Sequence, residues 1–411
     1  MLQPSHLEYI LQKIMATAPD ISDINITEGH PFQVEQEGEL TPVYFEPEIE
    51  TLSAFQTESI AICLLRSNRR LIRNLLTTGS CDMAYAIPGR ARFRVNVFTQ
   101  QGKYSIVMRR LANNIFTLED LGLPETFIQM ADESNGLIFV TGATGSGKST
   151  TLAAMLDEIN NTKACHVVTL EDPVEFMHPP KRATFNQREL GIDFHTFAEG
   201  LRAALRQAPK VILIGEIRDR ETLEIALAAA ETGHLVFATL HANDATSTVA
   251  RVLGLFDLEE ERQIRVRLAG VLRWVISQRL LPKVGGGRVV AMEIMGASLL
   301  IKDIISNGET EDKTLYNATA SMRPVGFQTF DQHILDLYRD RFITEETARV
   351  FCTKKSVVSR GLDTIKAQQG EMDALTELTL ESTQEAPPPP EPAKGRAAAH
   401  HTRTNTDAAG M

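Results

Sequence analysis

A glycine-rich segment of eight residues constrains this chain more than any other feature of its sequence. It fits the pattern GxxxxGK[ST] and comprises, in order, Gly142, Ala143, Thr144, Gly145, Ser146, Gly147, Lys148 and Ser149. The apolar run Leu137–Val140 precedes it and a helix-forming stretch follows it, which is the strand–loop–helix setting that the pattern requires. That setting disfavours the alternative, a Gly/Ser-rich turn that fits by chance. The segment therefore predicts a phosphate-binding loop.

The residue types of this loop predict how it holds a nucleotide. Glycines let the backbone curl so that its N–H groups converge on phosphate oxygens. A helix beginning near Lys148 adds the positive end of its dipole, and the Lys148 ammonium suits the β- and γ-phosphates. The Ser149 hydroxyl suits Mg²⁺. We therefore predict that residues 142–150, Thr150 included, bind ATP and that Ser149 is a magnesium ligand.

The residues around and after the loop predict an α/β domain with a parallel sheet. Short apolar runs bounded by Gly, Pro or charged residues are typical of strands buried on both faces, and they occur at Leu137–Val140, His166–Leu170, Val211–Ile214, Leu235–Leu240 and Val289–Met292. Helical patterns lie between several of these runs, at Thr150–Asn160, Phe197–Arg206 and Arg220–Glu231. Such alternation favours a doubly wound fold.

Three regions differ in their sequence patterns. Residues 1–114 mix a helix at Ser5–Ala16, a helix at Gln56–Leu76 and alternating strands at Asp23–Ile26, Phe32–Gln36 and Arg90–Phe98, which predicts a smaller α+β domain. Residues 115–366 form the α/β domain, and beyond Gly296 they turn helical, with a buried stripe expected at Phe330, Ile334, Leu337 and Tyr338. Residues 367–411 are predicted to be a disordered tail, because few large apolar residues follow Leu380.

The charge and the cysteine content of the chain narrow the class of protein to which it can belong. Its 411 residues carry a formal net charge of -11, which disfavours nucleic acid as a partner. The four cysteines, Cys63, Cys81, Cys165 and Cys352, form no CxxC pair, so we expect neither a thiolate zinc site nor a disulfide framework. Neither a signal peptide nor a membrane span is evident. We expect a cytoplasmic protein whose membrane contact, if any, is peripheral.

Acidic residues follow two of the predicted strands. Glu171 and Asp172 come directly after His166–Leu170, where carboxylates are well placed to hold Mg²⁺ or its waters. The alternative there is a strand-ending turn at Asp-Pro. Glu216 follows Val211–Ile214 and Gly215, and Gly215 stands where a Walker B strand usually carries Asp. A carboxylate at Glu216 can polarise the attacking water, and the alternative is a solvated acid at a strand end.

Two histidines stand at opposite ends of the predicted strand Leu235–Leu240. His241 follows the carboxyl end of this strand, on the nucleotide side, where an imidazole can act as a sensor or hydrogen-bond donor near the γ-phosphate. His234 precedes the other end, and for it we prefer a structural role.

These four clusters, in this order and spacing, resemble the secretion-superfamily ATPases. Within that superfamily, the chain is similar to the PilT/PilU type IV pilus retraction ATPases, with supporting stretches at Gly89–Phe98, Asn186–Glu189, Leu281–Ile294 and Phe327–Leu337. The resemblance implies a PAS-like N-terminal domain, a RecA-like ATPase domain and a homohexameric ring. It also implies that Mg-ATP hydrolysis powers pilus retraction, and hence twitching motility, by acting on an inner-membrane platform protein, with a paralogous retraction ATPase as a further partner.

The resemblance also suggests arginines that act across a ring. Arg206, Arg218 and Arg251 match basic positions near the nucleotide, and Arg92 and Arg94 match N-terminal positions that face a neighbour's site. An arginine from a neighbouring subunit can stabilise transition-state charge, although each could instead form a surface ion pair. The catalytic set that we predict is Glu216, Glu171, His241, Arg206, Arg218 and Arg251.

Some features depart from the PilT pattern and leave alternatives open. PilT-type ATPases carry the signature Ala-Ile-Arg where this chain has Leu300, Ile301, Lys302 and Asp303. They also carry the signature Asp-Leu-His where this chain has Asp23, Ile24 and Asn25. The Leu300–Asp303 stretch is closer to the PilU type, as are the segment Leu205–Pro209 and the long tail. The alternatives are a secretion-system ATPase, or an accessory nucleotide-binding subunit with little activity of its own. The absence of a four-cysteine motif disfavours the pilus extension and type II secretion branch.

Overall fold

The computed structural model describes residues 2–18, 21–36, 39–46, 49–111 and 114–369. The chain divides into two compact units, Met1–Ser359 and Arg360–Met411. Of the second unit, the structure describes only the last part of helix α14 (Lys355–Gln369). All but the first three residues of the predicted tail, 367–411, therefore lie outside the described residues, and its disorder stays a prediction.

The N-terminal region forms the smaller α+β domain, which is PAS-like. Its antiparallel sheet has the order β3-β2-β1-β6-β5-β4, with strands β1 (Asp23–Ile26), β2 (Phe32–Gln36), β3 (Glu39–Val43), β4 (Ser80–Ile87), β5 (Ala91–Gln100) and β6 (Lys103–Leu111). Buried and more exposed residues alternate along the first eight residues of β5, as expected for a strand with one face in a core. Helix α1 (Pro4–Thr17) buries Leu7, Leu11 and Ile14 in that core.

The helix expected at Gln56–Leu76 is wrong in one respect, because the structure has two helices there. These are α2 (Ala54–Leu65) and α3 (Arg69–Thr78). Arg66 and Ser67 between them adopt left-handed backbone angles, with φ of 45° and 61°, which ends a right-handed helix. The Asn68 side chain then accepts hydrogen bonds from the first amides of α3 and caps it.

The second sheet has seven strands in the order β13-β12-β7-β11-β10-β8-β9. The strands are β7 (Gly136–Gly142), β8 (His166–Glu171), β9 (Thr184–Glu189), β10 (Val211–Ile214), β11 (Leu235–Leu240), β12 (Leu272–Pro282) and β13 (Arg288–Gly296). All pairings are parallel except that of β12 with β13. The predicted runs are confirmed as strands, but Val289–Met292 is antiparallel to its neighbour, and neither β9 nor β12 was expected.

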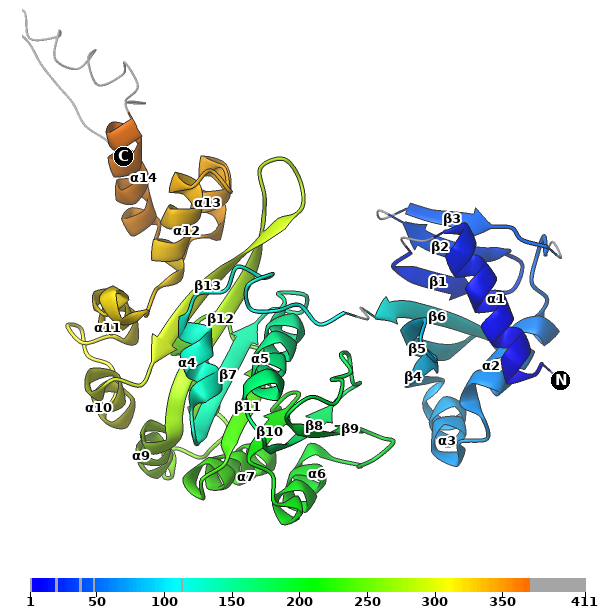
Figure 1. The fold of residues 1–411 in the computed structure, drawn as a ribbon, viewed down its shortest axis with the longest axis horizontal. Coiled ribbons are helices and arrows are strands. Elements are labelled where there is room, and N and C mark those ends of the chain that lie inside the picture. Colours follow the sequence, from blue (N-terminus) through cyan, green and yellow to red (C-terminus); the bar gives the residue numbers. More distant parts are fainter. Residues whose placement is uncertain (1, 19–20, 37–38, 47–48, 112–113, 370–411) are drawn as a thin grey trace, which may run out of the picture. The chain divides into compact units, whose positions relative to one another are not determined.

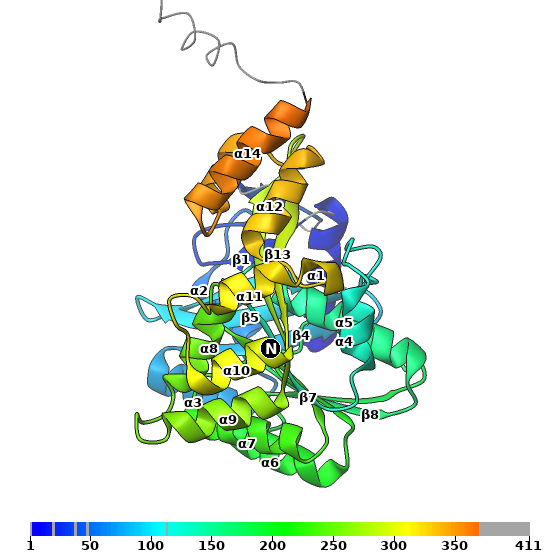
Figure 2. The same cartoon turned by 90° about the vertical axis from the view of Figure 1, so that its left-hand side faces the viewer.

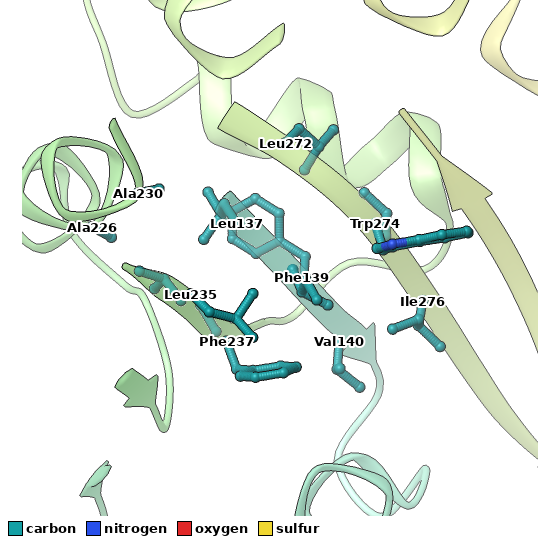
Figure 3. Close-up of a cluster of buried hydrophobic side chains, with 14 of the residues drawn as sticks. Leu137, Phe139, Val140, Ala226, Ala230, Leu235, Phe237, Leu272, Trp274 and Ile276 are labelled. Atoms are coloured by element: carbon teal, nitrogen blue, oxygen red, sulfur yellow. The ribbon is translucent and has the colours of Figure 1, made fainter. Parts of the chain in front are cut away.

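The core of this domain surrounds β7. Every residue of β7 is buried, and its side chains pack among those of β11, β12 and α7 (Arg220–Glu231). Figure 3 shows this cluster, with Leu137, Phe139 and Val140 at its centre and with Leu235, Phe237, Leu272, Trp274, Ile276, Ala226 and Ala230 around them. A strand that is apolar along its whole length can be stable only when both of its faces are covered.

Helices cover both faces of this sheet, as in a doubly wound, RecA-like fold (Figures 1 and 2). Helices α4 (Thr126–Asp132) and α5 (Lys148–Thr162) pack together on one face. The other face carries α6 (Phe197–Ala204), which continues into the short helix η1 (Leu205–Gln207), together with α7, α8 (Ala245–Leu253) and α9 (Glu261–Val271). Among the described residues, no helix has the length and apolar character that crossing a bilayer requires.

The region after Gly296 is helical, as expected. It contains α10 (Leu299–Asn307), α11 (Leu315–Ser321), the short helix η2 (Arg323–Val325), α12 (Phe330–Arg339), α13 (Glu345–Phe351) and α14. Three residues of the predicted stripe on α12 are buried, namely Phe330, Ile334 and Leu337, whereas Tyr338 is partly exposed.

Candidate functional site

The carboxyl ends of four parallel strands meet at one edge of the second sheet. Pairing of β8, β10, β11 and β7 in register places the residues that follow these strands side by side. A cleft at this edge is lined by residues that include Thr144, Gly145, Gly147, Lys148, Ser149, Thr150, Glu171, Glu175, Gly215, Glu216, Arg218, Thr239 and His241. The fold therefore brings the predicted loop, acids and histidine together.

The loop after β7 has the backbone conformation that its glycines permit. Gly145 and Gly147 have φ of +76° and +92°, and helix α5 begins at Lys148. At Gly142 a Cβ atom would lie 2.5 Å from both the Gln278 carbonyl oxygen and Ser146 Oγ, so no side chain fits there. The loop thus curls tightly against β12 and presents the N-terminus of a helix to the cleft, which is the arrangement that binds phosphate.

The side chain of Lys148, the first residue of α5, reaches back to the start of this loop. Its Nζ donates hydrogen bonds to the carbonyl oxygens of Gly142 and Ala143, both at 2.9 Å. Burial lowers the pKa of the Lys148 ammonium, and the Glu175 carboxylate partly opposes this effect. A cation held by neutral carbonyl groups in a shielded position attracts an anion strongly.

Glu171, at the end of β8, is a carboxylate shielded from water. Its Oε1 accepts a hydrogen bond from Thr169 Oγ1 at 2.6 Å and one from Gln187 Nε2 at 3.2 Å. Burial nevertheless raises the pKa of Glu171 to about 7, because it penalises the charged form more than these hydrogen bonds favour it. A divalent cation beside this carboxylate would favour its ionised form.

Glu216 lies between a cation and an imidazole. Its carboxylate contacts the Arg218 guanidinium, and its Oε2 lies 3.5 Å from His241 Nε2. The pKa of His241 is lowered first by burial and then by the positive charges of Lys148, Arg218 and Arg251. The imidazole is therefore neutral near pH 7, and it can either donate or accept a hydrogen bond.

Gly215 occupies a position that leaves little room for a side chain. Its Cβ would lie 3.0 Å from the Leu170 carbonyl oxygen and 3.2 Å from Glu171 Cα. The Gly215 N–H donates to that carbonyl group at 2.7 Å. Close contact between β10 and β8 thus gives a physical reason for glycine at this position, with Glu171 beside it.

The remaining predicted residues lie in several places. Ser149 and Thr150 line the cleft, as does Arg218. Arg206 lies on η1 and donates to the Arg202 carbonyl oxygen, and Arg251 lies on α8; neither lines the cleft. The Nδ1 atom of His234 lies 3.0 Å from the Ala229 carbonyl oxygen, a contact that fits the structural role preferred for this residue.

The cleft also contains residues that the sequence analysis did not identify. Phe176 and His178 come from the connection between β8 and β9, and Leu280 and Arg288 come from the β12–β13 hairpin. The segment that contains Arg288 supported the family resemblance, but its pattern did not indicate that it reaches the phosphate loop.

A RecA-like domain with a glycine-rich loop at the N-terminus of α5, and with carboxylates on the neighbouring strands, defines a P-loop nucleoside-triphosphate hydrolase. Comparison with known proteins narrows this class. The family model for the type II/IV secretion system protein matches residues 79–380. The chain belongs to this family and is an ATPase.

Individual relatives match most of the chain. The type IV pilus retraction ATPase PilT of Pseudomonas aeruginosa is 42% identical over 331 residues, which cover 80% of this chain and 93% of PilT. The type IV pilus ATPase PilU of the same bacterium is 38% identical over 329 residues, or 80% of this chain and 84% of PilU. A solved structure of the pilus retraction motor PilT with bound ADP has a TM-score of 0.77 at 39% identity, covering 88% of this chain and 100% of that chain.

The raised pKa of Glu171 leads to a prediction about stability. The folded protein keeps this proton up to about pH 7, whereas an unfolded chain loses it near pH 4.5. The stability that this pKa difference contributes to the folded protein is therefore fully present below pH 4.5 and is lost as the pH rises to about 7. Without nucleotide, Glu171→Gln should raise the melting temperature, by a few degrees more at pH 8 than at pH 6, in thermal unfolding followed by circular dichroism.

The control for this measurement is Glu199→Gln, at an exposed residue in the first turn of α6. Its effect on the melting temperature should be the same at both pH values. An effect of Glu171→Gln that does not change with pH would show that this carboxylate is not a buried, titrating group.

Proposed function

We propose that this ATPase is a hexameric motor that hydrolyses Mg-ATP and powers type IV pilus retraction by acting on an inner-membrane platform protein. The observation that carries the proposal is the match to PilT, which extends over 93% of that protein at 42% identity. The cleft supports it, because the loop, the acids and the histidine expected of such a motor lie at one edge of the sheet. A motor of this kind works in the cytoplasm, at the inner face of the membrane.

The residues of the cleft have the chemistry to bind Mg-ATP. Loop residues 142–150 surround the phosphates, and Lys148 neutralises part of their charge. Hard oxygen ligands suit Mg²⁺, and the Ser149 hydroxyl and the Glu171 carboxylate supply them. Because Gly215 carries no carboxylate where a Walker B strand usually has one, Glu171 on the adjacent strand takes its place. The ion, when bound, neutralises charge that develops on the phosphate oxygens.

The proposed general base is Glu216. Its carboxylate orients and polarises the water that attacks the γ-phosphate. His241, neutral near pH 7, hydrogen-bonds to this carboxylate or to the phosphate and so senses the state of the nucleotide. Arg218 holds the Glu216 side chain in place.

The proposed ring gives a role to the predicted arginines other than Arg218. Arg206 and Arg251, and Arg92 and Arg94 of the N-terminal domain, would be brought to a neighbour's nucleotide by assembly. A closed ring gives each subunit one such heterologous contact. A paralogous ATPase is a further expected partner, since both PilT and PilU are relatives of this chain.

The separate effects of Lys148 and Glu216 on ATP binding and on turnover can be measured with purified protein. Lys148→Ala should weaken ATP binding and turnover together, because it removes a phosphate contact. Glu216→Gln should leave ATP affinity within about twofold and lower turnover by roughly 10²–10⁴, the usual contribution of general-base catalysis. Phosphate release and nucleotide titration give the two quantities, with Glu224→Gln on α7 as a control that keeps both. Near-normal turnover by Glu216→Gln would remove this residue from the mechanism.

Assembly makes a separate prediction about concentration. If sites are completed by a neighbour's arginine, turnover per subunit should rise with protein concentration as rings form and then level off. Arg251→Ala should lower the plateau on the order of tenfold or more without changing the melting temperature. The measurement combines phosphate release with sedimentation across a dilution series. A monomer that hydrolyses ATP as fast as the ring would contradict the shared site.

Retraction itself is tested in the bacterium that encodes this protein. Deletion of the gene should abolish or weaken twitching motility while pili remain on the cell surface. Wild-type protein should restore motility, and Glu216→Gln, expressed to the same level, should not. Loss of surface pili, or a secretion defect with normal motility, would point to pilus extension or to a secretion-system ATPase.

A further inference from the structure

Two charged residues of the β12–β13 hairpin lie on the same face of the sheet. Arg279 of β12 pairs with Ala291 of β13, and Ser277 of β12 pairs with Glu293 of β13. Paired residues point to the same side of a sheet, as do residues two apart along a strand, so Arg279 and Glu293 are diagonal neighbours. Glu293 is only 4% exposed, and Arg279 is partly buried. Neither residue lines the nucleotide cleft, so the proposed ATP site leaves both without a role.

The hairpin uses these two residues to hold the loop that follows β11. This loop begins at His241 and leads into α8 at Ala245. Arg279 Nη2 donates a hydrogen bond of 3.3 Å to the Asn243 carbonyl oxygen. Glu293 Oε1 accepts a hydrogen bond of 2.7 Å from the Ala245 N–H. Both contacts come soon after His241 in the chain, so they limit where its imidazole can lie.

The loop and the first turn of α8 form one unit. The N–H groups of Asn243 and Asp244 donate to Ser247 Oγ at 3.2 and 3.0 Å, and the Ser247 N–H donates to Asp244 Oδ1 at 2.7 Å. These local hydrogen bonds give the loop its shape. The contacts from Arg279 and Glu293 tie the beginning of this unit to the hairpin, so they affect the place of the whole loop rather than that of one side chain.

Arg279 is itself fixed by the region that follows β13. Its Nη1 donates to the Phe351 carbonyl oxygen at 2.7 Å, and its guanidinium lies 3.9 Å from the centre of the Phe330 ring. A planar guanidinium can donate to two carbonyl groups and stack on a ring at once, which an ammonium cannot do. Burial lowers the pKa of Arg279, and the Glu293 carboxylate partly opposes this effect. Because a guanidinium is protonated at physiological pH, Arg279 is a permanent donor that is held on several sides.

We propose that Arg279 is a positioning residue for ATP hydrolysis, because its contact with Asn243 fixes the loop that sets His241 against Glu216. His241 Nε2 lies 3.5 Å from Glu216 Oε2, and a shift of about 1 Å in such a group can lower the rate roughly 10²-fold. Arg279 acts on the reaction through this loop alone, since it does not line the cleft. The inference rests on the proposed function, in which Glu216 is the general base and His241 its hydrogen-bonding partner.

The test is a cycle of single and double variants of the full-length protein, assayed for ATP hydrolysis and for nucleotide affinity. Arg279→Ala should lower kcat on the order of tenfold. It should leave KM and ATP affinity within about twofold, because the groups that contact the nucleotide are unchanged. His241→Ala should lower kcat by at least as much. The double variant should be no slower than His241→Ala alone, because Arg279 then has no imidazole to position.

The matched control is Arg273→Ala, which removes an arginine from the same strand. Arg273 Nη2 donates to Asn135 Oδ1 at 2.8 Å, at the end of β12 away from the phosphate loop. This substitution should lower the melting temperature and leave kcat unchanged, so it measures what the loss of an anchored arginine does to the fold alone. If Arg279→Ala does not fold, Arg279→Lys replaces it in the cycle, because lysine keeps the charge beside Glu293 but lacks the planar fork of donors.

The outcomes separate the inference from the function on which it rests. Unchanged kcat in His241→Ala would remove His241 from the mechanism, and the positioning role with it. With His241→Ala impaired, the inference alone is overturned if Arg279→Ala loses stability but keeps its kcat, or if it raises KM instead of lowering kcat. It is also overturned if the effects of Arg279→Ala and His241→Ala multiply in the double variant, because Arg279 would then act independently of His241.

Discussion

Backbone pairing of β7 with two parallel neighbours, β11 and β12, is the interaction on which the rest of this ATPase depends. All seven residues of β7 are buried, so the strand is stable only between covered faces and paired edges. Its parallel register with β11, and that of β11 with β10 and β10 with β8, brings the ends of these strands to one edge. The phosphate loop, both acids and His241 share a cleft for this reason.

The cleft concentrates opposite charges in a shielded place. Burial lowers the pKa of Lys148 and raises that of Glu171 to about 7, so each group is less favourable in its charged form than it would be in water. A polyphosphate beside Lys148 and a cation beside Glu171 would each favour the charged form. The two shifts therefore fit membership of an ATPase family.

The β12–β13 hairpin joins the cleft to the helices that follow it. Leu280 and Arg288 of this hairpin line the cleft, whereas Arg279 and the Val284 N–H donate to the carbonyl oxygens of Phe351 and Phe342. Because β-strand side chains alternate between faces, a single hairpin can line the cleft and contact the region after β13 at once.

Local patterns were sufficient to predict the phosphate loop, the buried strands and the position of Glu216, because each depends on residues close together in the chain. Continuous apolar runs are typical of strands covered on both faces, but they do not show strand direction, so the antiparallel β13 could not be foreseen. The break between α2 and α3 depends on left-handed backbone at Arg66 and Ser67, two residue types that give no local signal for it. The raised pKa of Glu171 and the place of Leu280 and Arg288 in the cleft come from contacts between segments distant in sequence, so only the tertiary structure decides them.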